Sequence, residues 1–182
     1  MKVADKLTPE EAGALDEEAF VARFGTTYEH SPWVARGAWR RRPFDGFEGL
    51  ARAFETTVLE APVDRRLALV RAHPELAGRE AGEGALTVES TVEQASAGLD
   101  RLSAGELSRL RQLNAAYRAR FGFPLVVAVR AHTKASIFAQ GEARLESSPE
   151  EELATALGEI FKIARLRLRV LVQETDRGRD TT

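Results

Sequence analysis

The sequence predicts an all-α fold: a single compact domain of roughly seven to nine helices with one short buried extended segment. Helix-start signals, in which Ser, Thr or Asp precedes proline or acidic residues, stand before nearly every segment of helical apolar periodicity. Hairpin signals are missing. Residues 123–129 form the only run that could be a strand, and a lone short strand has no partner with which to pair. The chain of 182 residues has the length of one domain with a continuous core.

Four helices are predicted before residue 62. Thr8-Pro9-Glu10-Glu11 is a capping box with proline at the first helical position, Asp16 opens a second short helix, and Ser31-Pro32 repeats the start signal. From Asp45 onward the apolar residues follow the i, i+3, i+4, i+7 spacing of an amphipathic helix, and Pro62 ends it. These apolar residues are Phe47, Leu50, Ala51, Phe54, Val58 and Leu59.

A helix over about residues 63–72 leads to Arg71-Ala72-His73-Pro74-Glu75-Leu76-Ala77-Gly78, the stretch around which we expect the site to form. Proline disfavours helical backbone in the residue before it, so His73 should be the last residue of a helix or the first of a loop. An imidazole in that position is held by a rigid element and can still face a pocket. The glycine-rich residues 78–84 predict a loop, and both a lid over substrate and a plain connection fit it.

The second half predicts four more helices. Thr87 caps one whose polar residues lie opposite its apolar stripe, Ser103 and Glu106 form a capping box, Thr133 caps a third, and Ser148-Pro149 opens the last, which reaches about Gln173. Phe123–Val129 is interpreted as buried extended backbone. The predicted domain covers residues 1–182, with its core over about 15–173 and a polar tail over 175–182.

The composition excludes several classes of function. The chain has no cysteine, so it has no disulfide, no thiolate nucleophile and no sulfur-ligated metal. A formal net charge of -2, with both signs mixed along the chain, favours neither nucleic acid nor an anionic membrane as partner. The acidic N-terminus does not resemble a signal peptide and no apolar run is long enough to span a membrane, so we expect a cytoplasmic protein. His30, His73 and His132 are not spaced as a metal pair, and we expect neither metal nor cofactor.

Five candidate residues, in three groups, each have a structural and a functional interpretation. From its place alone, His73 is more simply a histidine favoured by the C-terminal end of a helix dipole. Ser90, Glu93 and Gln94 could be a solvated helix face, although their i, i+3, i+4 spacing places them within reach of one small ligand. Arg167 lies among apolar positions of the last helix, so its guanidinium should point into the protein, where it needs an acidic partner or a bound anion.

Five segments together resemble the 2-oxo-4-hydroxy-4-carboxy-5-ureidoimidazoline (OHCU) decarboxylase family, from about Leu15 to Leu171. Each segment is a weak motif alone, whereas five in the same order are specific. They are Glu29-His30-Ser31-Pro32-Trp33-Val34-Ala35, His73-Pro74-Glu75-Leu76-Ala77-Gly78, Leu86-Thr87-Val88-Glu89-Ser90-Thr91-Val92-Glu93-Gln94, Phe121-Gly122-Phe123-Pro124-Leu125-Val126-Val127-Ala128-Val129-Arg130 and Ile163-Ala164-Arg165-Leu166-Arg167-Leu168.

The resemblance implies an all-α homodimer without metal or organic cofactor that decarboxylates OHCU, a small molecule, to S-allantoin at the last step of urate oxidation. His73 matches the family's catalytic acid, which implies stereospecific protonation by this residue, and Glu93 is expected to orient the imidazole or the substrate. Arg167 would neutralise either the substrate carboxylate or Glu93. The substrate-binding positions implied are Pro74, Ser90, Thr91, Val92, Glu93, Gln94, Leu125, Val126, Val127, Ala128, Val129 and Arg167.

Two alternatives stay open from the sequence. A helical binding or scaffold module would use His73 as a cap, leave Ser90, Glu93 and Gln94 solvated, and pair Arg167 with an acid in the core. A related enzyme could instead act on another ureido compound, which only a panel of substrates would distinguish. The enzyme interpretation requires His73, Glu93 and Arg167 to converge on one pocket.

Overall fold

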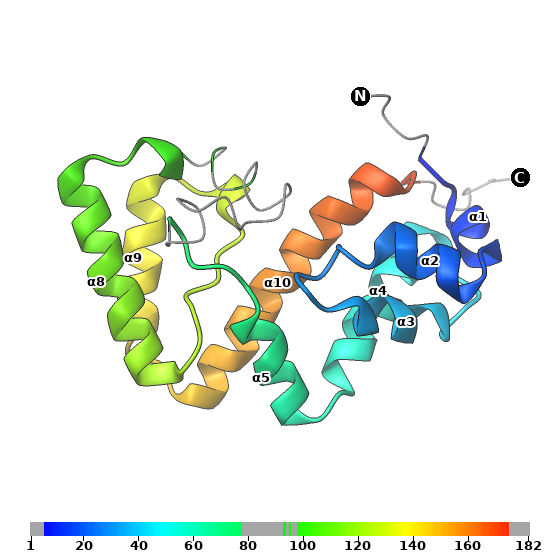
Figure 1. The fold of residues 1–182 in the computed structure, drawn as a ribbon, viewed down its shortest axis with the longest axis horizontal. Coiled ribbons are helices and arrows are strands. Elements are labelled where there is room, and N and C mark those ends of the chain that lie inside the picture. The colour runs from blue at the N-terminus through cyan, green and yellow to red at the C-terminus, as the bar shows by residue number, and fades with distance from the viewer. Residues whose placement is uncertain (1–5, 78–92, 94, 96–97, 175–182) are drawn as a thin grey trace, which may run out of the picture. The chain divides into compact units, whose positions relative to one another are not determined.

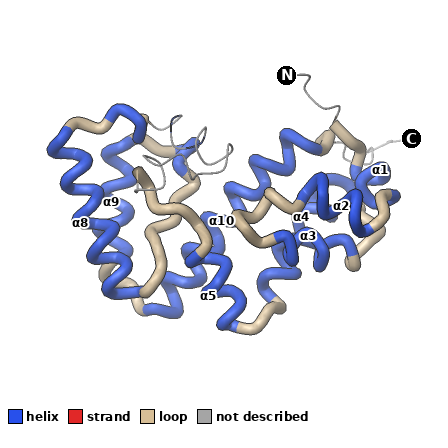
Figure 2. The backbone as a smooth tube through the Cα atoms, viewed as in Figure 1, coloured by secondary structure: helices blue, strands red, loops and turns tan. Residues whose placement is uncertain are grey.

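The all-α prediction is confirmed for the part of the chain that the computed structural model describes, which is residues 6–77, 93, 95 and 98–174. Within it lie eight α-helices, inside the predicted range of seven to nine, and two short 3-10 helices. Figure 2 shows helices joined by loops, and among these residues no strand occurs, only an isolated bridge between Leu7 and Val172. The loop predicted over 78–84 and the tail from Thr175 lie outside the described residues.

The chain folds into two compact units, Met1–Arg66 with Ile163–Thr182, and Leu67–Lys162. The first is called the terminal unit and the second the central unit below. The last helix, α10 (Pro149–Leu171), contributes residues to both, as does α5 (Val63–Arg71). The single domain expected from the sequence therefore stays a prediction.

The terminal unit contains α1 (Pro9–Ala14), α2 (Glu17–Phe24), α3 (Pro32–Trp39) and α4 (Gly46–Leu59), each beginning where its start signal predicts. Thr8 and Glu11 form the predicted capping box, and the Asp16 side chain accepts the Ala19 N–H. The helices α2 and α4 both pack on α3 (Figure 1). Gly37 permits the approach of α3 to α4, since a Cβ atom there would lie 2.2 Å from Cγ2 of Thr57.

The end of α10 differs slightly from the prediction. The helix was expected to reach about Gln173, whereas it ends at Leu171. The backbone of Leu7 accounts for the difference, because its N–H donates to the Leu171 carbonyl at 3.0 Å and its carbonyl accepts the Gln173 N–H at 2.8 Å. This parallel pairing takes the place of the last helical turn.

The central unit contains α8 (Ala104–Phe121) and α9 (Lys134–Arg144), which pack against one another (Figure 1). Ser103 and Glu106 form the predicted capping box of α8, and Gly122 closes that helix with a φ of 72°. Close packing depends on Gly141 of α9, where a Cβ atom would lie 2.7 Å from methyl carbons of Leu113 and Leu125. Residues 123–128 follow α8 as buried non-helical backbone, as predicted, whereas Val129, the last residue of the predicted segment, begins a 3-10 helix (Val129–Ala131).

Candidate active site

His73 lies in the turn that follows α5, as the proline after it predicts. The helix ends at Arg71, and the His73 N–H still donates to the Val70 carbonyl at 3.2 Å. His73 is partly exposed, whereas Pro74 is buried. A rigid helix end thus holds His73 without enclosing it.

Side chains of α8 and the carbonyl of its C-cap residue form hydrogen bonds with this turn on both sides of His73. Arg118 donates through Nε and Nη2 to Oε1 of Glu75, at 2.9 and 2.6 Å. The buried side chain of Asn114 donates to the Leu76 carbonyl at 3.0 Å. On the other side of the histidine, Nε of Arg71 donates to the carbonyl of Gly122 at 3.2 Å. These contacts restrict the backbone from which the imidazole projects, and orientation of this kind is what an acid–base residue requires.

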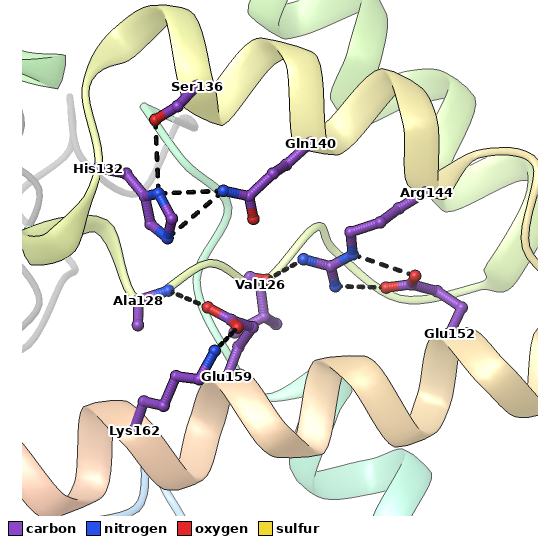
Figure 3. Close-up of polar contacts among 9 residues, drawn as sticks. All are labelled: Val126, Ala128, His132, Ser136, Gln140, Arg144, Glu152, Glu159 and Lys162. Atoms are coloured by element: carbon purple, nitrogen blue, oxygen red, sulfur yellow. Dashed lines mark hydrogen bonds and ion pairs between the residues drawn. The ribbon is translucent and has the colours of Figure 1, made fainter.

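The segment Leu125–Val129, called the extended segment from its sequence prediction, is the second predicted part of the site, and it is buried along its whole length. Two of its backbone groups are engaged by side chains (Figure 3): the Val126 carbonyl accepts from Nη1 of Arg144 at 2.9 Å, and the Ala128 N–H donates to Oε2 of Glu159 at 2.8 Å. Among the described residues no hydrogen bond engages the N–H or the carbonyl of Val127, between these two positions. A buried backbone pair of this kind calls for a partner.

Buried charges on α9 and α10 support this segment. Glu152 is fully buried and pairs with Arg144, with Nη2 to Oε1 at 2.5 Å and Nε to Oε2 at 3.1 Å. Glu159 is 6% exposed and also accepts from the Lys162 ammonium at 2.6 Å. Burial opposes ionisation of Glu159, but the Ala128 N–H and Lys162 outweigh it and hold the pKa of its carboxyl below the ordinary value. The carboxylate is therefore charged at neutral pH.

Arg144, Glu152 and Glu159 were not among the site residues predicted from the sequence. A signal for the two acids was present, because they are seven residues apart in the last helix and share a face with the apolar residues Ala156, Ile160 and Ile163. An acid among apolar neighbours on one helix face is buried, and a buried carboxylate needs donors.

Glu93 is buried, with 6% of its surface exposed, and its backbone is helical as predicted. The solvated-face interpretation is therefore wrong for this residue. The other predicted ligands of the same helix, Ser90, Thr91, Val92 and Gln94, lie outside the described residues.

Arg167 points into the terminal unit, as its place among apolar residues predicts, and is 6% exposed. Its Nη1 donates to Oε2 of Glu29 at 2.8 Å, and it lies 3.4 Å from the Thr26 carbonyl. Glu29 is itself buried, so this is an ion pair inside the protein. An acid was one of the two partners expected for Arg167, although the sequence did not identify it as Glu29. His73 and Glu93 belong to the central unit, and the convergence of the three residues stays a prediction.

The remaining histidines have local explanations. Nδ1 of His132 lies 3.0 Å from Nε2 of Gln140 and 3.4 Å from Oγ of Ser136, while His30 is exposed with a φ of 48°. No group of three or more potential metal ligands occurs among the described residues. Within the same part of the chain, no helix is long and apolar enough to cross a membrane.

Comparison with known proteins agrees with this arrangement. The family model described as OHCU decarboxylase matches residues 13–169. The chain is 43% identical over 159 residues to the OHCU decarboxylase of Mus musculus, covering 87% of this chain and 89% of that protein. It is 42% identical over 171 residues to the protein of the same name from Halalkalicoccus jeotgali, covering 94% of this chain and 95% of the relative.

Solved structures share the fold. A crystal structure of (S)-allantoin synthase superposes with a TM-score of 0.74 at 29% identity, covering 92% of this chain, which spans 54% of that longer protein. A crystal structure of OHCU decarboxylase in the presence of (S)-allantoin superposes with a TM-score of 0.63 at 22% identity, covering 85% of this chain and 96% of the other, and so supports the fold. On the family match and these relatives together, the chain belongs to the OHCU decarboxylase family.

Proposed function

We propose that this chain converts OHCU to (S)-allantoin and carbon dioxide, with His73 as the proton donor. Membership of the family supports the reaction class, a decarboxylation in urate degradation. The observation that carries the role of His73 is its place on a turn fastened by Arg118, Asn114 and Arg71. A histidine whose ordinary pKa is about 6.5 can exchange protons near neutral pH.

The chemistry requires no external electron sink. When the bond between C4 and the carboxylate breaks, carbon dioxide leaves and the bonding electron pair moves into the adjacent C5=N bond of the ring. The ring nitrogen takes one proton, C5 takes a second, and the 4-hydroxyl releases its own as C4 becomes a carbonyl. One proton is therefore consumed for each carbon dioxide released. Many decarboxylases use pyridoxal phosphate or thiamine to accept this electron pair, whereas here the substrate does so.

Stereochemistry is decided at C5, which carries the ureido group and becomes the stereocentre. His73 delivers its proton to one face of that carbon, and water then reprotonates the imidazole. Glu93 orients the imidazole or the substrate, and its burial supports this role because a buried carboxylate must interact with donors or cations. The substrate is held by Ser90, Thr91, Val92 and Gln94 and by the backbone of Leu125–Val129.

Arg167 is proposed to bind the substrate carboxylate as well as Glu29. A guanidinium has five N–H donors and can bind more than one carboxylate at the same time, so pairing with Glu29 is compatible with a second anionic partner. Pairing with Glu29 also fixes the direction of the side chain before substrate arrives.

We further propose that the protein acts in the cytoplasm as a homodimer, as the family resemblance implies. Light scattering coupled to gel filtration would give the mass in solution, for which about twice the 20.0 kDa chain is expected. A mass of one chain at micromolar concentration would contradict the dimer.

Circular dichroism of a urate oxidation mixture tests the reaction. OHCU decarboxylates spontaneously without stereochemical preference, so the mixture alone should give racemic allantoin and no lasting signal. With the protein, the signal of (S)-allantoin should develop and persist. A mixture that stays optically inactive would contradict the proposed function, and a panel of other ureido compounds tests whether the substrate is OHCU.

A further inference from the structure

Figure 3 shows the segment Leu125–Val129 between α9 and α10, with Arg144 reaching it from α9 and Glu159 from α10. All three lie in the central unit, and each contact stays within it. Glu159 reaches the backbone directly at the Ala128 N–H, whereas Glu152 acts through Arg144, which donates to the Val126 carbonyl. Two buried acids thus fix one donor and one acceptor, two residues apart in the chain.

Spacing by two residues has a geometric consequence. The peptide bonds here are trans, so the N–H of Val127 points opposite to the Val126 carbonyl, and the Val127 carbonyl points opposite to the Ala128 N–H. Val126 and Ala128 direct the engaged groups toward Arg144 and Glu159. The N–H and carbonyl of Val127 therefore point away from the Arg144 guanidinium and the Glu159 carboxylate, and no described residue hydrogen-bonds to them.

We propose that Glu159 and Arg144 are positioning residues, which hold the backbone of residues 126–128 so that the Val127 N–H and carbonyl receive a ligand that carries an amide N–H beside a C=O. Such a donor and acceptor pair is what one residue of an edge strand offers to another. The cyclic urea and the ureido group of OHCU both have this pattern. The inference rests on the proposed function, and it adds residues that do not touch the substrate.

The buried carboxylate of Glu159 is held in one orientation, as the positioning role requires. Oε2 accepts the Ala128 N–H and Oε1 accepts from Lys162, so the carboxylate is oriented by two different donors. Hydrogen bonds to charged groups are stronger and shorter than neutral ones, which suits a contact that must hold a backbone group in place. Misplacement of a binding group by about 1 Å is enough to reduce rates by about a hundredfold.

The test compares Glu159→Ala, Glu159→Gln and the matched control Glu150→Gln, an exposed glutamate of the same helix. Steady-state kinetics on freshly generated OHCU should show KM raised about tenfold in Glu159→Ala, with a smaller change in kcat. Glu159→Gln should lie between that variant and the wild type, because an amide oxygen can still accept the Ala128 N–H. Glu150→Gln should match the wild type.

Two further measurements separate positioning from general destabilisation. The Ala128 amide resonance should shift and its hydrogen exchange should accelerate in Glu159→Ala, and the enantiomeric excess of the allantoin should fall. If Glu159→Ala does not fold, Arg144→Lys and Glu159→Gln decide the question, because lysine keeps a charge for Glu152 but loses the planar fork that also reaches Val126.

Unchanged KM and enantiomeric excess in folded Glu159 or Arg144 variants of an active enzyme would overturn the inference. A wild-type protein that leaves the allantoin racemic would instead contradict the proposed function. The two failures are therefore distinguishable.

Discussion

The buried pair of Arg167 and Glu29 gives a prediction whose size follows from the structure. Replacing Arg167 by methionine keeps most of the side-chain volume but removes the cation from a carboxylate that is 3% exposed. Breaking a buried ion pair from one side destabilises proteins by about 3–5 kcal/mol, because the remaining charge stays desolvated. For a chain of this length, each kcal/mol lowers Tm by about 2–4 °C, so Arg167→Met should melt roughly 6–20 °C below the wild type.

Urea unfolding followed by circular dichroism measures the change in unfolding free energy directly. Arg169→Met is the matched control, because Arg169 is 43% exposed and pairs with Glu174 near the surface, where such pairs contribute at most about 1 kcal/mol. The double variant Glu29→Met with Arg167→Met removes both charges and should recover much of the stability lost in Arg167→Met. A loss of unfolding free energy below about 1 kcal/mol in Arg167→Met would refute the reasoning. A double variant whose loss equals the sum of the losses in the two single variants would also refute it.

Three other substitutions test the supports of the site. Asn114→Ala leaves the buried Leu76 carbonyl without its side-chain donor, and should lower the unfolding free energy by about 1–3 kcal/mol and reduce kcat/KM, as thermal melts and kinetics would show. Gly141→Ala inserts a methyl group 2.7 Å from two leucine methyl carbons and should lower the unfolding free energy by about 1–3 kcal/mol in the same melts. An unchanged melting temperature would contradict the close packing of α9 at this position. The pKa of Glu159 is below its ordinary 4.5, so its ionised form stabilises the fold above about pH 4.5 and that contribution is lost as the pH falls through the lowered value. The stability difference between wild type and Glu159→Gln should therefore be constant near neutral pH and shrink on acidification, and a difference that grows in acid would contradict the assignment.

Most of the helices could be predicted because their signals are local. Thr8, Ser103 and Thr133 each precede a helix and each side chain accepts the N–H of the third helical residue, as the sequence pattern requires. The C-cap at Gly122 follows from glycine's access to positive φ. The end of α10 could not be predicted, because it depends on Leu7, which is more than 160 residues away in the chain.

For the site, as for the helices, features with a local cause in the sequence could be predicted, and features that depend on distant residues could not. His73 could be placed at a helix end from the proline beside it, and Arg167 could be placed inside from its apolar neighbours in one helix. Their partners could not be predicted, since Asn114 reaches Leu76 and Glu29 reaches Arg167 across 38 and 138 residues. Periodicity shows that a charge is buried, but only the tertiary structure shows which group neutralises it.

The central claim is that His73 delivers the proton that makes the product chiral. The most direct measurement is the enantiomeric excess of allantoin formed from freshly generated OHCU, followed by circular dichroism, with wild-type protein and with His73→Ala and His73→Asn. Both variants are predicted to remain folded and to give racemic allantoin at the spontaneous rate, while the wild type gives the S enantiomer. Optically active (S)-allantoin produced by His73→Ala at the wild-type rate would contradict the claim.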